Sequence, residues 1–180
     1  MLLHHGKLLV AEAEPTTLPL EVPSPVSFQV AALATHGFVG FRSHPYPTCF
    51  VCGPDRLDAD GLGLYPGAVP GRKLVAAAWS PAADLCDRQG RVAQRYVWSA
   101  LDCPAWYGYL AFSERKAPTL LGRMASDVQR LPERAEPCVL IGWHLRTEGR
   151  RILVASAMFG ADRKCIARSV CTWITLTSRV

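Results

Sequence analysis

Proline and glycine divide the hydrophobic residues of the chain into short runs, and the longest apolar stretch is residues 90–112 (GRVAQRYVWSALDCPAWYGYLAF). At helical spacing this stretch has one face of small apolar residues, namely Ala93, Val97, Ala100, Leu101, Ala105 and Gly108. A second face holds Arg95, Trp98, Asp102, Trp106 and Tyr109. A helix that is apolar nearly all round is usually buried, so the pattern predicts a long buried helix at the centre of the fold.

Strand-like patterns dominate the part of the chain that follows this helix. Four apolar segments separated by turn residues are predicted to be strands: 120–131, 138–146, 152–159 and 165–176. Two shorter strands, 62–65 and 73–79, are predicted before the helix. One long helix wrapped by a curved antiparallel sheet is an α+β arrangement, and this is the predicted fold class.

The predicted sheet has apolar residues on both faces, most clearly in residues 152–159 (ILVASAMF) and also in 165–176. An antiparallel sheet with one helix usually leaves one face in water. The pattern therefore predicts that another subunit covers the second face, in a homodimer or a tetramer.

Residues 1–40 are predicted to be an N-terminal extension, and residues 41–180 a single domain. The extension contains a strand at 7–13, an extended linker with four prolines at 15–25, and a helix at 26–39. Ser24 is the predicted cap of that helix, with Pro25 at its first position.

Asp102 is the residue of the central helix whose presence most needs a reason, because an unpaired buried charge is costly. Two structural explanations involve Pro104, since proline is tolerated in the first turn of a helix and not deep inside one. Asp102 is then either the N-cap of a helix that starts there, or a partner for backbone donors at a kink. In a third interpretation, burial among aromatic residues raises the pKa of Asp102, which suits a general base or acid.

The charge fits an anionic small ligand or no charged partner at all, and it is weak evidence for a nucleic-acid site. The net charge of +5 is modest, and its arginines are spread through the second half of the chain, so no nucleic-acid partner is predicted. No apolar run approaches the ~18 residues of a membrane helix, and the N-terminus MLLHHGKLLV lacks the centre of a signal peptide. We therefore expect a cytoplasmic protein that does not interact with membranes.

Seven cysteines occur, an odd number without a secretion signal, so reduced thiols are expected. Cys49 and Cys52 have CxxC spacing and His44 lies nearby, but a zinc site normally has four ligands, often from two such pairs. Nothing in the spacing identifies Cys86 as a further ligand. The sequence alone therefore leads us to assign no metal and no cofactor, with zinc kept as the less favoured alternative.

Three stretches together resemble a known family. They are residues 44–64 (HPYPTCFVCGPDRLDADGLGL), residues 97–109 (VWSALDCPAWYGY) and the C-terminal strands that end in WITL. From about residue 40 onward, the chain is similar to the PaaI-like acyl-CoA thioesterase superfamily, whose members have the hot-dog fold. The resemblance implies a homodimer with its two sheets joined edge to edge, and with active sites at the subunit interface.

The resemblance also implies a ligand, a thioester of coenzyme A or of acyl carrier protein. Asp102 falls on the helix carboxylate of the family, whose role is general base for water or nucleophile. The backbone amides of Gly90, Arg91 and Val92 are expected to face the thioester carbonyl oxygen. Side chains expected to contact the acyl chain or the coenzyme A phosphates are Trp98, Trp106, Tyr109, Arg163 and Lys164.

Two functions remain open at this level. The first is hydrolysis of an acyl thioester, with Asp102 as the catalytic carboxylate. The second is a hot-dog module that binds an acyl-CoA or a related apolar ligand without hydrolysing it. One departure from the family pattern favours the second function. Residues 89–92 read Gln-Gly-Arg-Val, where many active members of the family have His-Gly-Gly.

Overall fold

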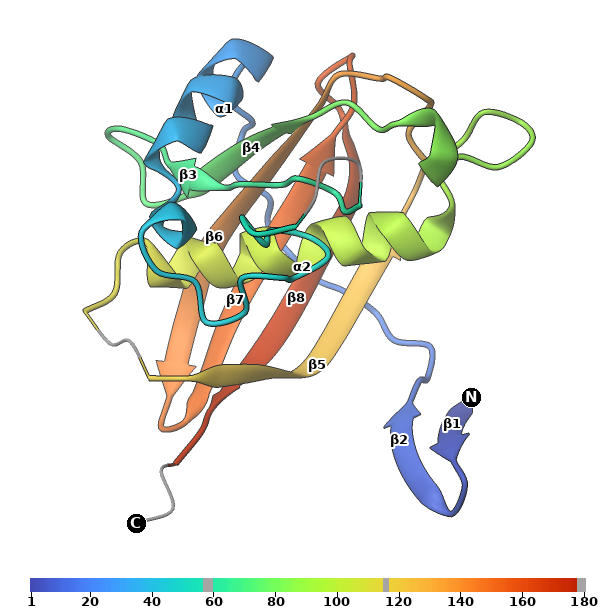
Figure 1. Cartoon of the computed structure of the whole chain (residues 1–180), viewed down its shortest axis with the longest axis vertical. Coiled ribbons are helices and arrows are strands. Elements are labelled where there is room, and N and C mark those ends of the chain that lie inside the picture. Colours follow the sequence, from blue (N-terminus) through green and yellow to red (C-terminus); the bar gives the residue numbers. More distant parts are fainter. Residues whose placement is uncertain (57–59, 115–116, 178–180) are drawn as a thin grey trace.

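A six-stranded antiparallel sheet curves around one long helix in the computed structural model (Figure 1). The structure describes residues 1–56, 60–114 and 117–177, so residues 57–59 of the 44–64 motif lie outside the described part. In chain order the elements are β1 (Leu2–His5), β2 (Leu8–Glu12), α1 (Phe28–Ala34), the 3₁₀ turns η1 (Thr35–Gly37) and η2 (Val39–Phe41), β3 (Gly67–Ala68), β4 (Val75–Trp79), η3 (Ala83–Leu85), α2 (Gln94–Leu110), β5 (Thr119–Val128), β6 (Cys138–Glu148), β7 (Arg151–Phe159) and β8 (Cys165–Thr175). The strand order is β3-β4-β6-β7-β8-β5, which confirms the predicted α+β class. No helix within the described ranges is long and apolar enough to cross a membrane.

The central helix α2 packs against the sheet at very short range because the helix and strand β6 each place a glycine against the backbone of the other. A Cβ atom on Gly142 of β6 would lie 1.7 Å from the carbonyl oxygen of Pro104, and one on Gly108 would lie 2.3 Å from the amide of Trp143. The small apolar face predicted for the helix is buried from Val97 onward, whereas Ala93 is half-buried and precedes the helix. The predicted helix is therefore confirmed, although it begins at Gln94 rather than near residue 90.

Pro104 lies inside α2, so the prediction that Asp102 caps a helix start is wrong. The N-cap position belongs to Ala93, nine residues before Asp102. Proline lacks the amide that would bond to the carbonyl four residues earlier. The next carbonyl, that of Leu101, accepts a hydrogen bond from Ser156 Oγ at 2.6 Å. A buried side chain from β7 therefore stabilises the helix beside its proline.

The four C-terminal strands are confirmed as β5, β6, β7 and β8, and the strand at 73–79 is confirmed as β4. The strand predicted at 62–65 is absent from the described structure. Its amides bond instead to the preceding loop, with Leu62 N–H donating to Phe50 O (2.8 Å) and Leu64 N–H to Val51 O (2.9 Å). Apolar residues at 62–65 therefore anchor a loop onto the core.

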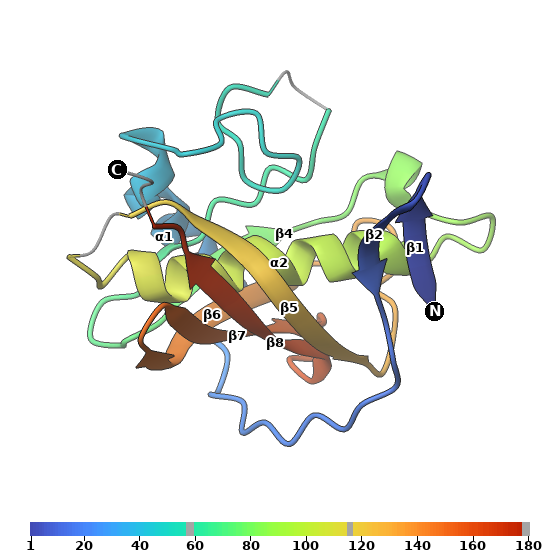
Figure 2. The same cartoon turned by 90° about the horizontal axis from the view of Figure 1, so that it is seen from below.

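The face of the sheet opposite α2 is covered in part by the chain itself, so its apolar residues do not by themselves require a second subunit, and the predicted oligomer stays a prediction. Figure 2 shows the extended N-terminal segment passing along this face. Arg168 holds the segment through a hydrogen bond to the Leu20 carbonyl at 3.1 Å. Helix α1 adds a second hydrophobic core between itself and the sheet, with Ala31 fully buried. This helix is shorter than predicted, and its cap is Ser27, not Ser24.

The first residues form a two-stranded hairpin that extends away from the sheet (Figure 1). The predicted strand at 7–13 is confirmed as β2, and β1 is a strand that the sequence pattern did not reveal. All residues of both strands are exposed. The hairpin therefore contributes little to the main core.

Candidate functional site

Asp102 lies in the middle of α2, close to Cys49 of the preceding loop and to Cys171 of β8. It is largely buried, and its Oδ1 atom has no hydrogen-bond partner within the described structure. Burial, and to a lesser extent the nearby charge of Cys49, raise the pKa of Asp102 to about 7. A carboxyl group with a pKa near neutrality can both take up and release a proton at physiological pH, which is the property of a general base or acid.

Two further buried polar atoms without a partner lie on the same side of the sheet. They are Ser126 Oγ on β5 and Trp173 Nε1 on β8. Trp173 stacks on Trp106 at 4.9 Å, and Trp106 follows Asp102 by one turn of α2. Ser126 pairs across the ladder with Ser169, which faces the helix. Unpaired buried polar atoms are costly, and a polar ligand between α2, β5 and β8 would give these atoms partners.

Aromatic side chains continue this region along α2. Trp106 and Tyr109 are buried and lie 5.3 Å apart, and Tyr109 contacts His144 of β6 at 5.2 Å. The structure therefore brings two of the three predicted acyl-pocket residues together. Trp98 lies one turn before Asp102 on the same side of the helix, but its side chain is 37 % exposed. Trp173 and His144 were not predicted, because their proximity to α2 depends on how the sheet folds over the helix.

The three amides predicted to face a thioester carbonyl already have partners within the chain. Gly90 N–H donates to Asp87 O (3.0 Å), Arg91 N–H to Asp87 Oδ1 (3.0 Å) and Val92 N–H to Pro132 O (2.8 Å). This corrects the predicted set of donors: these amides are not free to bind a ligand in the chain as it folds.

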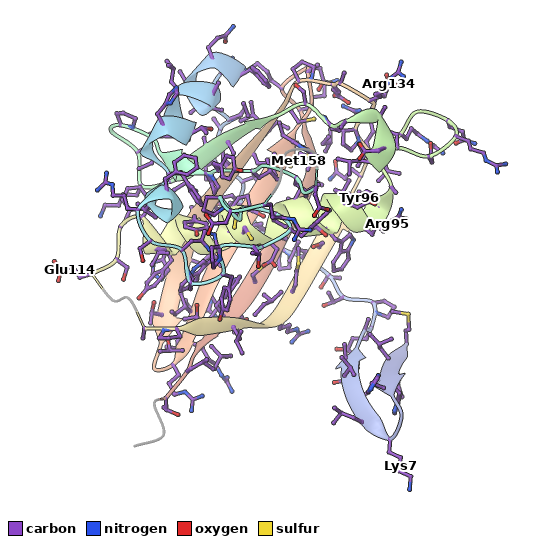
Figure 3. All side chains as sticks on the ribbon, viewed as in Figure 1. Lys7, Arg95, Tyr96, Glu114, Arg134 and Met158 are labelled. Atoms are coloured by element: carbon purple, nitrogen blue, oxygen red, sulfur yellow. The ribbon has the colours of Figure 1, made fainter. Side chains whose placement is uncertain are left out.

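Free amides occur slightly later, in the first turn of α2. Within the described residues, the N–H groups of Gln94 and Arg95 have no acceptor. Figure 3 shows Arg95 and Tyr96 at this end of the helix, where the Arg95 guanidinium lies 4.6 Å from the centre of the Tyr96 ring. A groove of about 350 Å³ opens beside this turn and is lined by Arg91, Gln94, Val128, Gln129, Arg130 and Leu131. The free amides and the two arginines make this groove suitable for an anionic group.

Arg163 and Lys164 lie in the turn between β7 and β8 and are not brought to Asp102 by any contact in the described structure. Lys164 Nζ lies 3.7 Å from Asp162 Oδ2, and Arg163 donates to the Pro25 carbonyl at 3.5 Å. Their predicted contact with coenzyme A phosphates remains a prediction.

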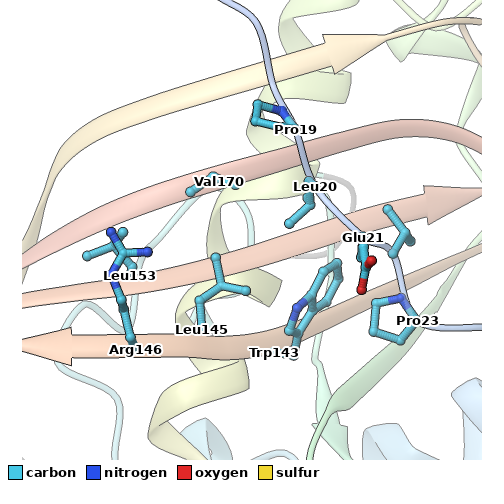
Figure 4. A pocket seen from close by; sticks show the side chains of 10 residues that line it. Pro19, Leu20, Glu21, Pro23, Trp143, Leu145, Arg146, Leu153 and Val170 are labelled. Atoms are coloured by element: carbon cyan, nitrogen blue, oxygen red, sulfur yellow. The ribbon is translucent and has the colours of Figure 1, made fainter.

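A larger groove of about 710 Å³ lies on the opposite face of the sheet, between the N-terminal segment and β6, β7 and β8 (Figure 4). Its lining residues are Pro19, Leu20, Glu21, Val22, Pro23, Trp143, Leu145, Arg146, Leu153 and Val170. The sheet separates this groove from Asp102, so it is not part of the candidate site.

The loop that carries Cys49 and Cys52 packs against α2 at Cys103, the residue next to Asp102. Cys86 belongs to a different loop, where its thiol contacts the Ala82 carbonyl. The sequence pattern gave Cys103 no role, because nothing in a linear spacing links it to a pair of cysteines that lies about fifty residues earlier.

No family model and no curated protein matches the chain, whereas solved structures share its fold, some of them of proteins named as thioesterases. Protein RHA08564, a thioesterase superfamily protein, is 16 % identical with a TM-score of 0.61, over 71 % of this chain and 60 % of that protein. The PaaI protein of E. coli is 9 % identical with a TM-score of 0.55, over 64 % of this chain and 81 % of that one. The smu.793 protein of Streptococcus mutans, solved with acetyl-CoA, is 8 % identical with a TM-score of 0.53, over 61 % of this chain and 86 % of that one. The predicted hot-dog fold and the resemblance to PaaI-like proteins are confirmed.

Proposed function

We propose that the chain hydrolyses an acyl thioester of coenzyme A or acyl carrier protein, with Asp102 as the catalytic carboxylate. The observation that carries this proposal is the buried, unpaired carboxyl group of Asp102 at the middle of α2 in a hot-dog fold. Two of the solved structures with this fold contain acetyl-CoA or coenzyme A. This supports a coenzyme A ester as the ligand class.

Asp102 acts as a general base in this proposal. Its carboxylate takes a proton from a water molecule, the water oxygen attacks the thioester carbonyl carbon, and the carbon–sulfur bond breaks. The proton then returns to the thiolate that leaves. Because the pKa of Asp102 is raised to about 7, a substantial fraction is ionised at neutral pH and is a stronger base than an ordinary aspartate.

The free amides of α2 are the best donors for the carbonyl oxygen, but those of the same chain are too far away. Eight residues separate Gln94 from Asp102, and at about 1.5 Å per residue this is roughly 12 Å along the helix. One carbonyl cannot contact both positions of one chain. The amides of Gln94 and Arg95 therefore serve the Asp102 of a second chain, which makes a homodimer part of the proposal.

The edge strand β5 is the proposed dimer contact. It ends the sheet on one side, whereas the other edge is the two-residue strand β3. A long unpaired edge is a ready template for another strand. The outer part of β5 carries the exposed apolar side chains Leu120 and Leu121. Pairing of two β5 strands would cover these leucines and bring the two helices to the same interface.

The remaining ligand contacts follow from the same arrangement. We propose that the acyl pocket is lined by Trp106 and Tyr109, together with Trp98, which lies one turn before Asp102 and is partly exposed. Arg163 and Lys164 keep their proposed role toward the coenzyme A phosphates, and the arginine-lined groove at the start of α2 is a second position for these phosphates.

Release of free thiol from short, long and aromatic acyl-CoAs tests the proposal. Wild type is compared with Asp102→Asn and with Asp84→Asn, a matched change of an acid outside the site. Protein-only blanks correct for the seven cysteines. We expect turnover in wild type and Asp84→Asn, and none in a folded Asp102→Asn protein. Equal turnover in all three proteins would exclude the catalytic role of Asp102.

The second candidate function is a hot-dog module that binds an acyl-CoA without hydrolysing it. It is favoured by the amides of residues 90–92, which are all paired within the chain. This alternative predicts saturable binding of coenzyme A esters, measured by calorimetry, with no thiol released by wild type or by either variant.

A further inference from the structure

Three cysteines from distant parts of the chain meet in front of α2. The sulfur atoms of Cys49, Cys52 and Cys103 all lie within 4.8 Å of one another, and the Cys49 and Cys103 sulfurs are 3.7 Å apart. The edge of a tetrahedral zinc–thiolate site is about 3.8 Å, given zinc–sulfur bonds of about 2.3 Å. The sulfur spacing therefore fits three corners of such a tetrahedron. Neither thioester hydrolysis nor acyl binding uses these thiols.

The loop around Cys49 and Cys52 has the tight turn that directs two sulfurs to the same side. The Gly53 amide donates to the Cys49 carbonyl at 2.9 Å, and a Cβ on Gly53 would lie 2.4 Å from the Cys49 amide nitrogen. The backbone amides of Val51 and Cys52 form hydrogen bonds to the Cys49 sulfur. Amides that point at a sulfur stabilise its thiolate form, which is the form that binds metals.

The three thiols gather in a position that is largely closed to solvent. Cys52 and Cys103 are buried, Cys49 is half-buried, and the Cys49 and Cys103 sulfurs are in contact at 3.7 Å. Sulfur ligands brought together in this way are the kind of donor set that zinc prefers.

His44 approaches the cluster from the side of Cys52. Its Nε2 atom lies 3.3 Å from the Cys52 sulfur, and its Nδ1 atom accepts a hydrogen bond from the Tyr46 amide at 3.0 Å. The bond at Nδ1 assigns the hydrogen of a neutral ring to Nε2, which then donates to Cys52. Among the described residues, no other His, Cys, Asp or Glu joins the three sulfurs within this range. His44 is therefore a supporting group rather than a ligand.

We propose that Cys49, Cys52 and Cys103 bind one zinc ion, with His44 supporting the Cys52 thiolate and an exogenous ligand such as water at the fourth position. Binding releases the thiol protons of the three cysteines to solvent, so that all three sulfurs coordinate as thiolates. The ion would join the loop of residues 44–56 to α2 at the residue next to Asp102. The Cys103 ligand lies in the helix itself, so the ion would stabilise the loop against the wall of the candidate site.

Metal content measures this directly, without any assay of turnover. Full-length protein is purified under reducing conditions without added metal, and zinc is quantified by elemental mass spectrometry. We expect about one zinc per chain in wild type and less than about one tenth in Cys49→Ser and Cys103→Ser. Cys86→Ser and Cys171→Ser are the matched controls, one half-buried and one buried, and both should keep the metal.

The affinity for zinc distinguishes the role of His44 from that of the three cysteine ligands. Loss of a supporting group lowers metal affinity by about 10- to 100-fold, so His44→Ala should still bind zinc in a chelator competition, although more weakly. Retention of wild-type affinity, or complete loss of binding, in a folded His44→Ala protein would overturn the assigned role.

Wild-type protein alone provides a second test in case the cysteine variants do not fold. Cobalt added to the reduced, metal-free protein should give the intense sulfur-to-cobalt charge-transfer absorption of a thiolate site, and zinc should remove it. Wild-type protein that contains no zinc and takes up neither ion would overturn the proposal, as would equal zinc loss in Cys86→Ser and Cys103→Ser. These results are independent of whether the protein hydrolyses thioesters.

Discussion

The two faces of the sheet are both buried, but they are built from different kinds of side chains. On the face opposite α2, the second core consists of hydrophobic residues, among them the fully buried Ala76, Ile141 and Ala157. On the face toward α2, a serine pair bonds to the helix and three buried polar atoms have no partner. A face that serves only stability avoids unpaired polar atoms. Their concentration beside α2 supports the proposal that a ligand binds on this face.

Replacement of Asp102 by Asn tests this comparison with the largest expected effect. A general base typically contributes ~10²–10⁴-fold to the rate, and we expect kcat for thioester hydrolysis to fall by that factor. The variant no longer buries a carboxylate, so its Tm should equal or exceed that of wild type. Thermal unfolding and single-substrate kinetics on the same preparation measure both. A large fall in Tm would show that Asp102 has a structural role instead.

Gly142→Ala tests the close packing of the helix side. The added Cβ would lie 1.7 Å from the Pro104 carbonyl oxygen, so α2 must move away from β6. We expect a loss of about 3 kcal/mol in the free energy of unfolding, at the upper end of overpacking effects. Denaturant titration measures it. Gly149→Ala, where a Cβ meets no atom within 4 Å, controls for the loss of a glycine, although its φ of 58° adds some strain. A small effect at both positions would show that the helix is not fixed by this contact.

Glu136→Gln tests a charged contact that belongs to neither face. The Arg130 guanidinium beside Glu136 lowers the pKa of that carboxyl to about 2 from 4.5. Because the folded-state pKa is lowered, the stabilisation is present above pH 4.5 and is lost as the pH falls toward 2. We expect the variant to lose about 2 kcal/mol at pH 7, since Arg130 is partly exposed, and almost nothing at pH 2. Denaturant titrations between pH 2 and 7 measure the difference, which should not exist if the ion pair is absent in solution.

Ile141→Val is the smallest change and tests the face opposite α2. Ile141 is fully buried in the second core. Removal of one methylene from a buried site costs about 1 kcal/mol, and kcat and KM should remain at wild-type values. A change in KM without a larger loss of stability would show that both faces contribute to ligand binding.

Much of the architecture could be predicted because it depends on local patterns. The helical spacing at 93–108 and the apolar runs of β5 to β8 are visible in any short window of sequence. Proline was a less reliable guide to where the helix begins. Pro104 suggested a helix start at Asp102, yet the hydrogen bond from Ser156 to Leu101 supports the helix beside it. That partner lies 55 residues away in the sequence and cannot be identified by local reasoning.

The candidate site was predicted only in part, because some of its features are local in the sequence and others join distant parts of the chain. Asp102 is conspicuous as an acid in an apolar helix, whereas the grouping of Cys103 with Cys49 depends on contacts across 54 positions. The donors for a thioester carbonyl were expected at residues 90–92. Their pairing with Asp87 and Pro132 became visible only once the loop before α2 was folded.

The roughly 12 Å between the first turn of α2 and Asp102 has a consequence for experiments at low protein concentration. If each site combines the amides of one chain with the carboxylate of another, activity per chain is a property of the dimer. Specific activity should then fall on dilution below the dissociation constant of the dimer, and an excess of inactive Asp102→Asn chains should restore part of it by supplying partners. A monomeric enzyme would show neither behaviour.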